Sequence, residues 1–251
     1  MAKNKLTALI TRPHPYDQRL AQQLNQANIN TVCQPVFCYQ ASGAPLSRKL
    51  AEYSVVIFIS AAAVNYCAAA GKLTSLASNN RHTHVLAVGK ATQQALAEQG
   101  VDAISPERHD TEGLLELDCL QATNIISKDV LIVRGDGGRE CLATQLTTRG
   151  ANVAYWESYQ RAWLDLPDNI AHTWQQNGVN CIIITSNNIL KYVVNLLKRA
   201  DNYWENNSML VVASERIAQT AKTLGFRHII NAQGASDEAM VSAIRKIGLK
   251  T

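Results

Sequence analysis

An internal repeat is the feature that most constrains how this 251-residue chain can fold. Three blocks of sequence each occur twice, in the same order, and the two copies lie 122 to 126 positions apart. Copies that keep both order and spacing predict two similar structural halves. The blocks and their second copies are Leu9–Arg12 with Leu131–Arg134, Val55–Ser60 with Cys181–Ser186, and Ala87–Gly100 with Val212–Gly225.

Each block follows one pattern: a short apolar run, then Gly, Ser, Pro or Asn, then apolar residues at helical spacing. Continuous apolar runs are typical of parallel strands that are buried on both faces. Strands that alternate with helices predict an α/β fold, and five strands per half favour two flavodoxin-like parallel-sheet domains with helices on both faces. The expected strands are Leu6–Thr11, Thr31–Phe37, Val55–Ser60, Val85–Val88 and Ala103–Ser105 in the first half, and Val130–Arg134, Val153–Ser158, Ile182–Thr185, Leu210–Ala213 and His228–Asn231 in the second.

Charge and cysteine usage limit the classes of partner. The chain has 24 basic and 20 acidic residues, a net charge of +4, and no run of Lys or Arg, so we expect no nucleic-acid partner. An anionic small molecule held in a local basic pocket fits this balance. The six cysteines form no C-x-x-C pair and the histidines lack partners at metal-ligand spacing, so we expect core thiols and no metal.

The N-terminal apolar run, Leu6–Thr11, is too short for a signal peptide core or a membrane span. We therefore expect a cytoplasmic protein with no membrane partner.

The loops after the strands hold the candidate ligand groups, since ligands of parallel sheets bind at the carboxyl ends of the strands. Free N–H groups at helix starts in these loops favour anions. For the serines and Thr92 the alternative is a purely structural role, such as capping the helix that follows. The candidates outside the glycine-rich turn are Arg12, Ser60, Thr92, Ser186 and Ser214.

The segment Val133–Glu140 is the sharpest of these loops and predicts a strand, a glycine turn and a helix start. Arg134 and the backbone amides of Gly135, Gly137 and Gly138 would bind a ligand oxygen there. The segment lacks the endings of a phosphate-binding loop and of a dinucleotide fingerprint. A tight turn without ligand is the alternative interpretation.

Tyr159 follows the strand that closes the repeat, and its counterpart 122 positions earlier is Phe37. A phenol beside Arg161 is a candidate proton donor. A half-buried structural tyrosine is the alternative.

Nine segments resemble the uroporphyrinogen-III synthase family along essentially the whole chain. They are Ala8–Pro13, Val55–Val64, Ala87–Leu96, Thr111–Leu117, Val130–Glu140, Arg149–Arg161, Ile184–Leu190, Ala213–Gly225 and Gly234–Ile244. The resemblance implies two flavodoxin-like domains, each interrupted by the other and joined by a short two-stranded bridge. On this chain it implies one domain of residues 1–34 and 164–251, a second of residues 41–156, and a bridge of residues 35–40 and 157–163.

The resemblance also implies the reaction. Hydroxymethylbilane loses its terminal hydroxyl as water, ring D inverts through a spiro intermediate, and the macrocycle closes without a cofactor. Tyr159 matches the tyrosine implicated in that family, and Ser60, Thr92, Ser186 and Ser214 match hydroxyls that line the substrate cleft. Some members carry threonine where Ile217 stands, which weakens the argument for a hydroxyl there.

Two other functions remain open on the residues alone. One is a two-lobed protein that binds an anionic small molecule without catalysis, and the other is a nucleotide-dependent α/β enzyme. The synthase interpretation predicts a polycarboxylate tetrapyrrole as the partner and a monomeric protein. Incubation with hydroxymethylbilane and separation of the type I and type III isomers would distinguish these interpretations.

Overall fold

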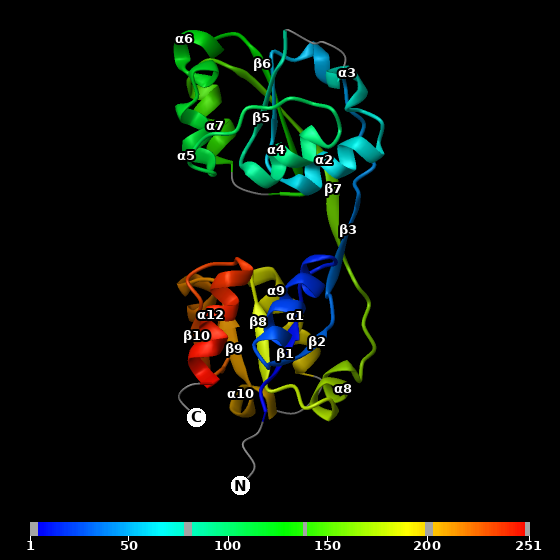
Figure 1. Ribbon diagram of the computed structural model, residues 1–251, viewed down its shortest axis with the longest axis vertical. Helices are drawn as coiled ribbons and strands as arrows, with labels where there is room; N and C mark the ends of the chain where they lie inside the picture. The colour runs from blue at the N-terminus through cyan, green and yellow to red at the C-terminus, as the bar shows by residue number, and fades with distance from the viewer. Residues whose placement is uncertain (1–4, 78–81, 138–139, 199–202, 249–251) are drawn as a thin grey trace. The chain divides into compact units, whose positions relative to one another are not determined.

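The computed structural model describes residues 5–77, 82–137, 140–198 and 203–248. The chain forms two compact units, which are described separately (Figure 1). Unit 1 consists of Met1–Cys38 and Ala162–Thr251, and unit 2 consists of Tyr39–Arg161. The first strands of the chain therefore belong with the C-terminal part of the sequence.

Unit 1 contains a five-stranded sheet in the order β10-β9-β8-β1-β2. Every neighbouring pair is parallel. Numbered along the unit, this order is 2-1-3-4-5, the flavodoxin-like arrangement predicted from the sequence. The strands are β1 (Thr7–Ile10), β2 (Asn30–Cys33), β8 (Cys181–Ile184), β9 (Met209–Val212) and β10 (His228–Asn231).

The helices of unit 1 pack in two groups, α1 with α12 and α9 with α8 and α11, as expected for a sheet covered on both faces. On α1, Leu20 and Leu24 are fully buried, and their spacing of four places them on one face. The helices are α1 (Tyr16–Gln26), α8 (Ile170–Gln176), α9 (Asn187–Leu197), α10 (Tyr203–Asn207), α11 (Glu215–Thr223) and α12 (Asp237–Gly248).

Unit 2 contains a five-stranded sheet in the order β3-β7-β6-β4-β5. Strands β7, β6, β4 and β5 pair in parallel. The order β5-β4-β6-β7 matches β9-β8-β1-β2 of unit 1, with β6 and β7 in the places of β1 and β2, and β3 is an additional edge strand beside β7. Each unit thus takes its first two strands from the other copy of the sequence repeat. The strands are β3 (Phe37–Ala41), β4 (Val55–Phe58), β5 (His84–Ala87), β6 (Asp129–Gly135) and β7 (Asn152–Trp163).

Strands β3 and β7 carry the chain between the two units. The amide of Leu164 donates to the carbonyl of Val36, and the amide of Ser42 donates to the carbonyl of Ser158. Residue numbers fall on one strand as they rise on the other, so these two strands run antiparallel.

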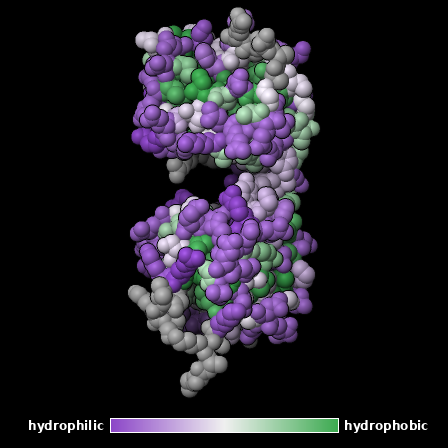
Figure 2. Space-filling view, viewed as in Figure 1, coloured by the Kyte–Doolittle hydropathy of each residue, from purple (hydrophilic) through white to green (hydrophobic). Residues whose placement is uncertain are grey.

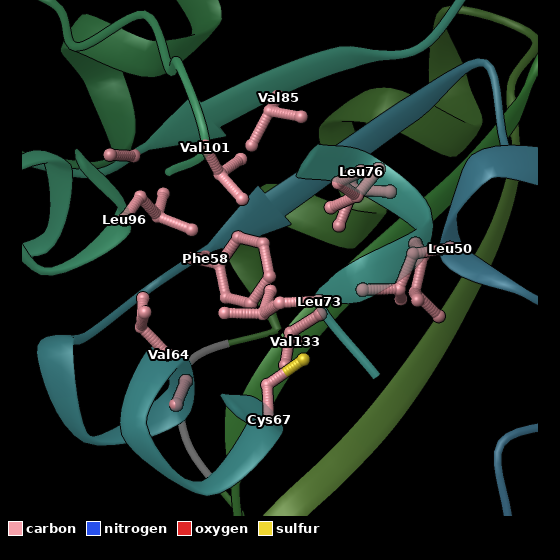
Figure 3. Close-up of a cluster of buried hydrophobic side chains, with 14 of the residues drawn as sticks. Leu50, Phe58, Val64, Cys67, Leu73, Leu76, Val85, Leu96, Val101 and Val133 are labelled. Carbon is pink, nitrogen blue, oxygen red and sulfur yellow. The ribbon is translucent and has the colours of Figure 1, made fainter. Parts of the chain in front are cut away.

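Strands β4 and β6 of unit 2 are buried on both faces, which explains their continuous apolar runs. Val56 and Phe58 of β4 belong to one hydrophobic cluster, whereas Val55 and Ile57 belong to a second. Figure 3 shows the first cluster, in which Phe58 lies among side chains from several helices and strands. The helices are α2 (Ala61–Ala69), α3 (Thr74–Ala77), α4 (Lys90–Ala97), α5 (Thr111–Glu116), α6 (Ala122–Ile125) and α7 (Cys141–Thr148), with 3-10 turns η1 (Leu50–Glu52) and η2 (Asp118–Leu120).

Two expected strands differ from the structure. The single strand predicted over Thr31–Phe37 is wrong: β2 ends at Cys33 and β3 begins at Phe37. Pro35 lacks the N–H that a continuous ladder needs, and the chain leaves β1 there to pair with β7. The strand predicted over Ala103–Ser105 is also wrong, since only an isolated parallel bridge joins Ile104 to Leu86.

Hydrophilic residues cover most of the face that Figure 2 shows for each unit. Within the described ranges, no helix has the length and apolar character needed to cross a membrane.

Candidate functional site

Tyr159 lies on β7 at the carboxyl edge of the unit 2 sheet. It pairs with Gly135, the last residue of β6, where the register of the two strands shifts. The amide of Asp136 donates to the carbonyl of Tyr159 at 2.9 Å, and the amide of Arg161 donates to the Asp136 carboxylate at 3.0 Å. These backbone bonds fix the strand that carries the phenol.

Ser60 lies beside the phenol. Its hydroxyl oxygen is 3.2 Å from that of Tyr159 and accepts the amide of Ala63 at 3.1 Å, which caps α2. Because the serine oxygen already accepts from Ala63, its own hydrogen can be donated to Tyr159. The capping bond is therefore compatible with the site role predicted for Ser60.

Two further tyrosines surround the ring of Tyr159. The Tyr66 ring is stacked on it, with centroids 5.5 Å apart and planes at 24°, and the Tyr39 ring meets it edge-on at 5.0 Å. Sequence reasoning missed both. Tyr66 lies 126 positions before Tyr192, the offset of the surrounding repeat, and this was the signal that could have found it.

The backbone at Gly135 packs closely against the Tyr159 ring. A methyl group on its Cα would lie 2.5 Å from Cε2 and Cζ of Tyr159 and 3.0 Å from the phenolic oxygen. Gly135 ends a strand and is not part of the predicted glycine turn, because its register partner is Tyr159 itself.

Arg134 is buried and its guanidinium is held by groups of the protein. It donates to Glu140 at 2.8 Å and to Glu157 at 3.3 Å, and its Cζ lies 3.7 Å from the ring centroid of Tyr155. The Tyr155 hydroxyl donates to Glu140 at 2.6 Å. That bond, together with Arg134, lowers the pKa of Glu140, while burial and then Glu140 raise the pKa of Tyr155 to about 12.

The turn after Arg134 is partly described. Gly137 has a left-handed φ of +68°, and its amide donates to Glu157 at 3.4 Å. That carboxylate marks an anion position built from the Gly137 amide and the Arg134 guanidinium. Gly138 lies outside the described residues. Helix α7 begins at Cys141, after Glu140.

Thr92 lies in the first turn of α4, whose N-cap is Gly89 in the loop after β5. The residue is 3% exposed, and its amide donates to the carbonyl of Gly89 at 3.0 Å. The helix start predicted there is confirmed.

Arg12 lies at the carboxyl edge of the unit 1 sheet and is buried. Its guanidinium donates to the buried Asp237 and, at 2.5 Å, to the carbonyl of Ala235. Arg19 donates to the other oxygen of Asp237 at 2.6 Å, and its side chain is 63% exposed. Sequence reasoning missed Arg19, an exposed cation held in place by a buried carboxylate.

The serines of unit 1 precede two helices at the same edge. Ser186 caps α9 by accepting the amide of Ile189 at 3.3 Å. Ser214 stands at the N-cap of α11, but its side chain makes no capping bond. Ile217 is buried in the first turn of α11, so the departure from the family pattern fills core space there.

The two units therefore present related groups at equivalent edges. Arg12 corresponds to Arg134 and Ser186 to Ser60, whereas Phe37 takes the place of Tyr159 and packs on Trp163 with centroids 5.5 Å apart. Within the described ranges, no cluster of His, Cys, Asp or Glu is placed to hold a metal ion. Hydroxyls, helix-start amides and one phenol beside a serine can bind carboxylates and donate a proton.

Comparison with known proteins identifies relatives along almost the full length. A family model described as "Uroporphyrinogen-III synthase HemD" matches residues 18–242. The uroporphyrinogen-III synthase of Salmonella typhimurium is 32% identical over 253 residues, which covers 96% of this chain and all of the relative.

Solved structures share the fold at lower identity. A mutant uroporphyrinogen III synthase of Thermus thermophilus aligns with a TM-score of 0.56 and 12% identity, covering 98% of this chain and 100% of that one. The Helicobacter pylori enzyme aligns with a TM-score of 0.56 and 15% identity, covering 97% of this chain and 99% of that one.

Proposed function

The chain belongs to the uroporphyrinogen-III synthase family, and on that premise we propose which of its groups perform the reaction. It is an enzyme of heme biosynthesis that cyclises hydroxymethylbilane. Closure of this linear tetrapyrrole releases its terminal hydroxyl as water, and the type III product requires inversion of ring D before closure. The enzyme must therefore activate a poor leaving group and hold a flexible polyanion in one arrangement.

Tyr159 is the proton donor in this proposal. Its proton joins the departing hydroxyl as the carbon–oxygen bond breaks, and water leaves. Ring closure later removes a proton from a pyrrole carbon, which restores the phenol. The contact with Ser60 supports this role, because a hydrogen donated by Ser60 would stabilise the phenolate and leave the phenolic proton for the substrate.

Polar groups at the strand ends of each unit are the candidates for binding substrate carboxylates. Helix starts near Thr92, Ser186 and Ser214 offer amides and hydroxyls of the kind that bind anions. In unit 2, a substrate carboxylate would compete with Glu157 for Arg134 and the amide of Gly137. In unit 1, Arg12 and Asp237 hold the exposed Arg19 in position. Preorganised charge of this kind is the main expected contribution to rate.

The test is incubation with enzymatically made hydroxymethylbilane, followed by separation of the type I and type III isomers. Wild-type protein should yield type III, and Tyr159→Phe should slow its formation at least ~10-fold, a minimum set below the ~10²–10⁴-fold typical of general acid catalysis. Uncatalysed closure should then shift the mixture toward type I. Tyr53→Phe is the control, since it removes a buried tyrosine hydroxyl that lies 3.3 Å from Ser47. A wild-type rate with pure type III product from Tyr159→Phe would remove Tyr159 from the chemistry.

We further propose that the enzyme acts as a monomer in the cytoplasm. The six cysteines are free thiols, which suits a reducing compartment.

A further inference from the structure

Helix α2 contacts Tyr159 at two points. Its N-cap, Ser60, lies beside the phenolic oxygen, and Tyr66, further along the same helix, is stacked on the ring. One rigid element thus touches both the oxygen and the face of the phenol. A side chain held at both points has little freedom to change its orientation.

The Tyr66 ring is itself anchored. Its hydroxyl donates to the backbone carbonyl of Tyr39 at 2.6 Å. Tyr39 lies on β3, and its own ring meets Tyr159 edge-on. The hydrogen bond therefore joins helix α2 to the strand beside β7 and fixes the plane against which Tyr159 rests.

Unit 1 contains the same hydroxyl-to-backbone anchor without the phenol. Tyr192, 126 positions after Tyr66, donates its hydroxyl to the carbonyl of Leu164. Its ring is stacked on Trp163, with centroids 4.7 Å apart and planes at 18°. The equivalent of Tyr159 in that unit is Phe37, which has no proton to donate. Both units therefore contain an anchored tyrosine, and in unit 2 the anchored ring packs on the phenol of Tyr159, whereas in unit 1 it packs on Trp163.

We propose that Tyr66 is a positioning residue for Tyr159: its stacked ring holds the phenol in the orientation from which the proton is donated. This inference rests on the role proposed for Tyr159. Tyr66 acts through Tyr159 and not on the substrate, so its loss should reduce kcat and leave KM nearly unchanged. A phenol free to turn misplaces its proton, and misplacement on the order of 1 Å can cost ~10²-fold in rate.

The test compares Tyr66→Met, which retains apolar volume without a planar face, with Tyr66→Phe, which retains the face without the hydroxyl. We expect kcat for type III product to fall at least ~10-fold in Tyr66→Met. In Tyr66→Phe it should fall by about fivefold or less, the value of one ordinary hydrogen bond. Tyr192→Met is the matched control and should retain kcat. If Tyr66→Met fails to fold, Tyr66→Leu replaces it.

A double-mutant cycle with Tyr159→Phe separates this inference from the proposed function. Once the phenol is absent, Tyr66→Met should cause little further loss. Wild-type kcat in Tyr66→Met beside a slow Tyr159→Phe would overturn the positioning role alone. Equal losses in Tyr66→Met and Tyr192→Met, or a raised KM, would also overturn it. A wild-type rate in Tyr159→Phe would overturn both proposals.

Discussion

Adding one methyl group at Gly135 tests whether the location of the phenol limits the rate. The new Cβ would lie 2.5 Å from the Tyr159 ring, whereas ordinary contact begins near 3.4 Å, so the ring must move by about 0.9 Å. Displacements of this size at a reacting group cost up to ~10²-fold. We expect Gly135→Ala to lower kcat by ~10- to ~100-fold, equivalent to ~1.4–2.7 kcal/mol in barrier. Overpacking should also lower the free energy of unfolding by ~1–3 kcal/mol.

Single-turnover kinetics with isomer analysis measures this effect, and urea unfolding measures the cost in stability. Gly100→Ala is the control, because Gly100 has a φ of +71° and no atom within 4 Å of the added methyl group. That variant should lose ~1–2 kcal/mol through backbone strain and keep its kcat. Wild-type kcat in folded Gly135→Ala would refute the argument, since the ring would then tolerate displacement without loss of rate.

Three other predictions concern charge. The KM for hydroxymethylbilane should rise between ~0.05 and ~0.5 M salt, because screening weakens partly exposed ion contacts; a constant KM in steady-state assays would contradict carboxylate binding by helix starts and arginines. Asp237→Ala should lower the free energy of unfolding in urea by roughly 3 kcal/mol because it leaves the buried Arg12 unpaired, whereas Arg19→Ala, at an exposed guanidinium, should cost less than about 1 kcal/mol. Equal losses would argue against a buried network. The pKa of Tyr155 is raised from 10.0 to about 12, so its contribution to stability is complete below pH 10 and is lost as the pH rises through about 12. The urea midpoint of unfolding, measured from pH 10 to about 12, should therefore fall less steeply with pH in Tyr155→Phe than in wild type. Parallel dependences on pH in the two proteins would count against the raised pKa of Tyr155.

Strands and helix starts could be predicted because they depend on local pattern. The run Val55–Phe58 is apolar throughout, since alternate side chains face two clusters, and Ser60 caps the helix that follows. Local pattern did not reveal the break in the strand predicted over Thr31–Phe37. Pro35 divides an otherwise continuous strand.

The exchange of strands between the repeat copies could not be predicted from the residues themselves. Leu9-Ile10 and Leu131-Ile132 are identical, and either run would fit either sheet. Only the family resemblance implied that the first strand joins the C-terminal half.

The contacts that the site residues make with other side chains could not be predicted from the sequence either. Asp237 lies 225 positions from Arg12, and the stacking of Tyr66 on Tyr159 depends on the relative placement of α2 and β7. Helical or strand periodicity carries no information at such separations.

The antiparallel pairing of β3 with β7 bears on the order in which the chain can fold during synthesis. Unit 2 is one continuous segment and leaves the ribosome whole, while β1, which pairs with β2 on one side, must wait for β8 as its second partner. Between β2 and β8 the chain spans well over a hundred residues, which is a long loop to close. Once unit 2 has folded, the pairing of Val36 with Leu164 holds both ends of that loop together, so the remaining closure spans only short segments. The entropic saving is about 2 kcal/mol, at roughly 0.6 kcal/mol for each halving of loop length. Hydrogen exchange during refolding should accordingly protect β4 and β6 before β1 and β8.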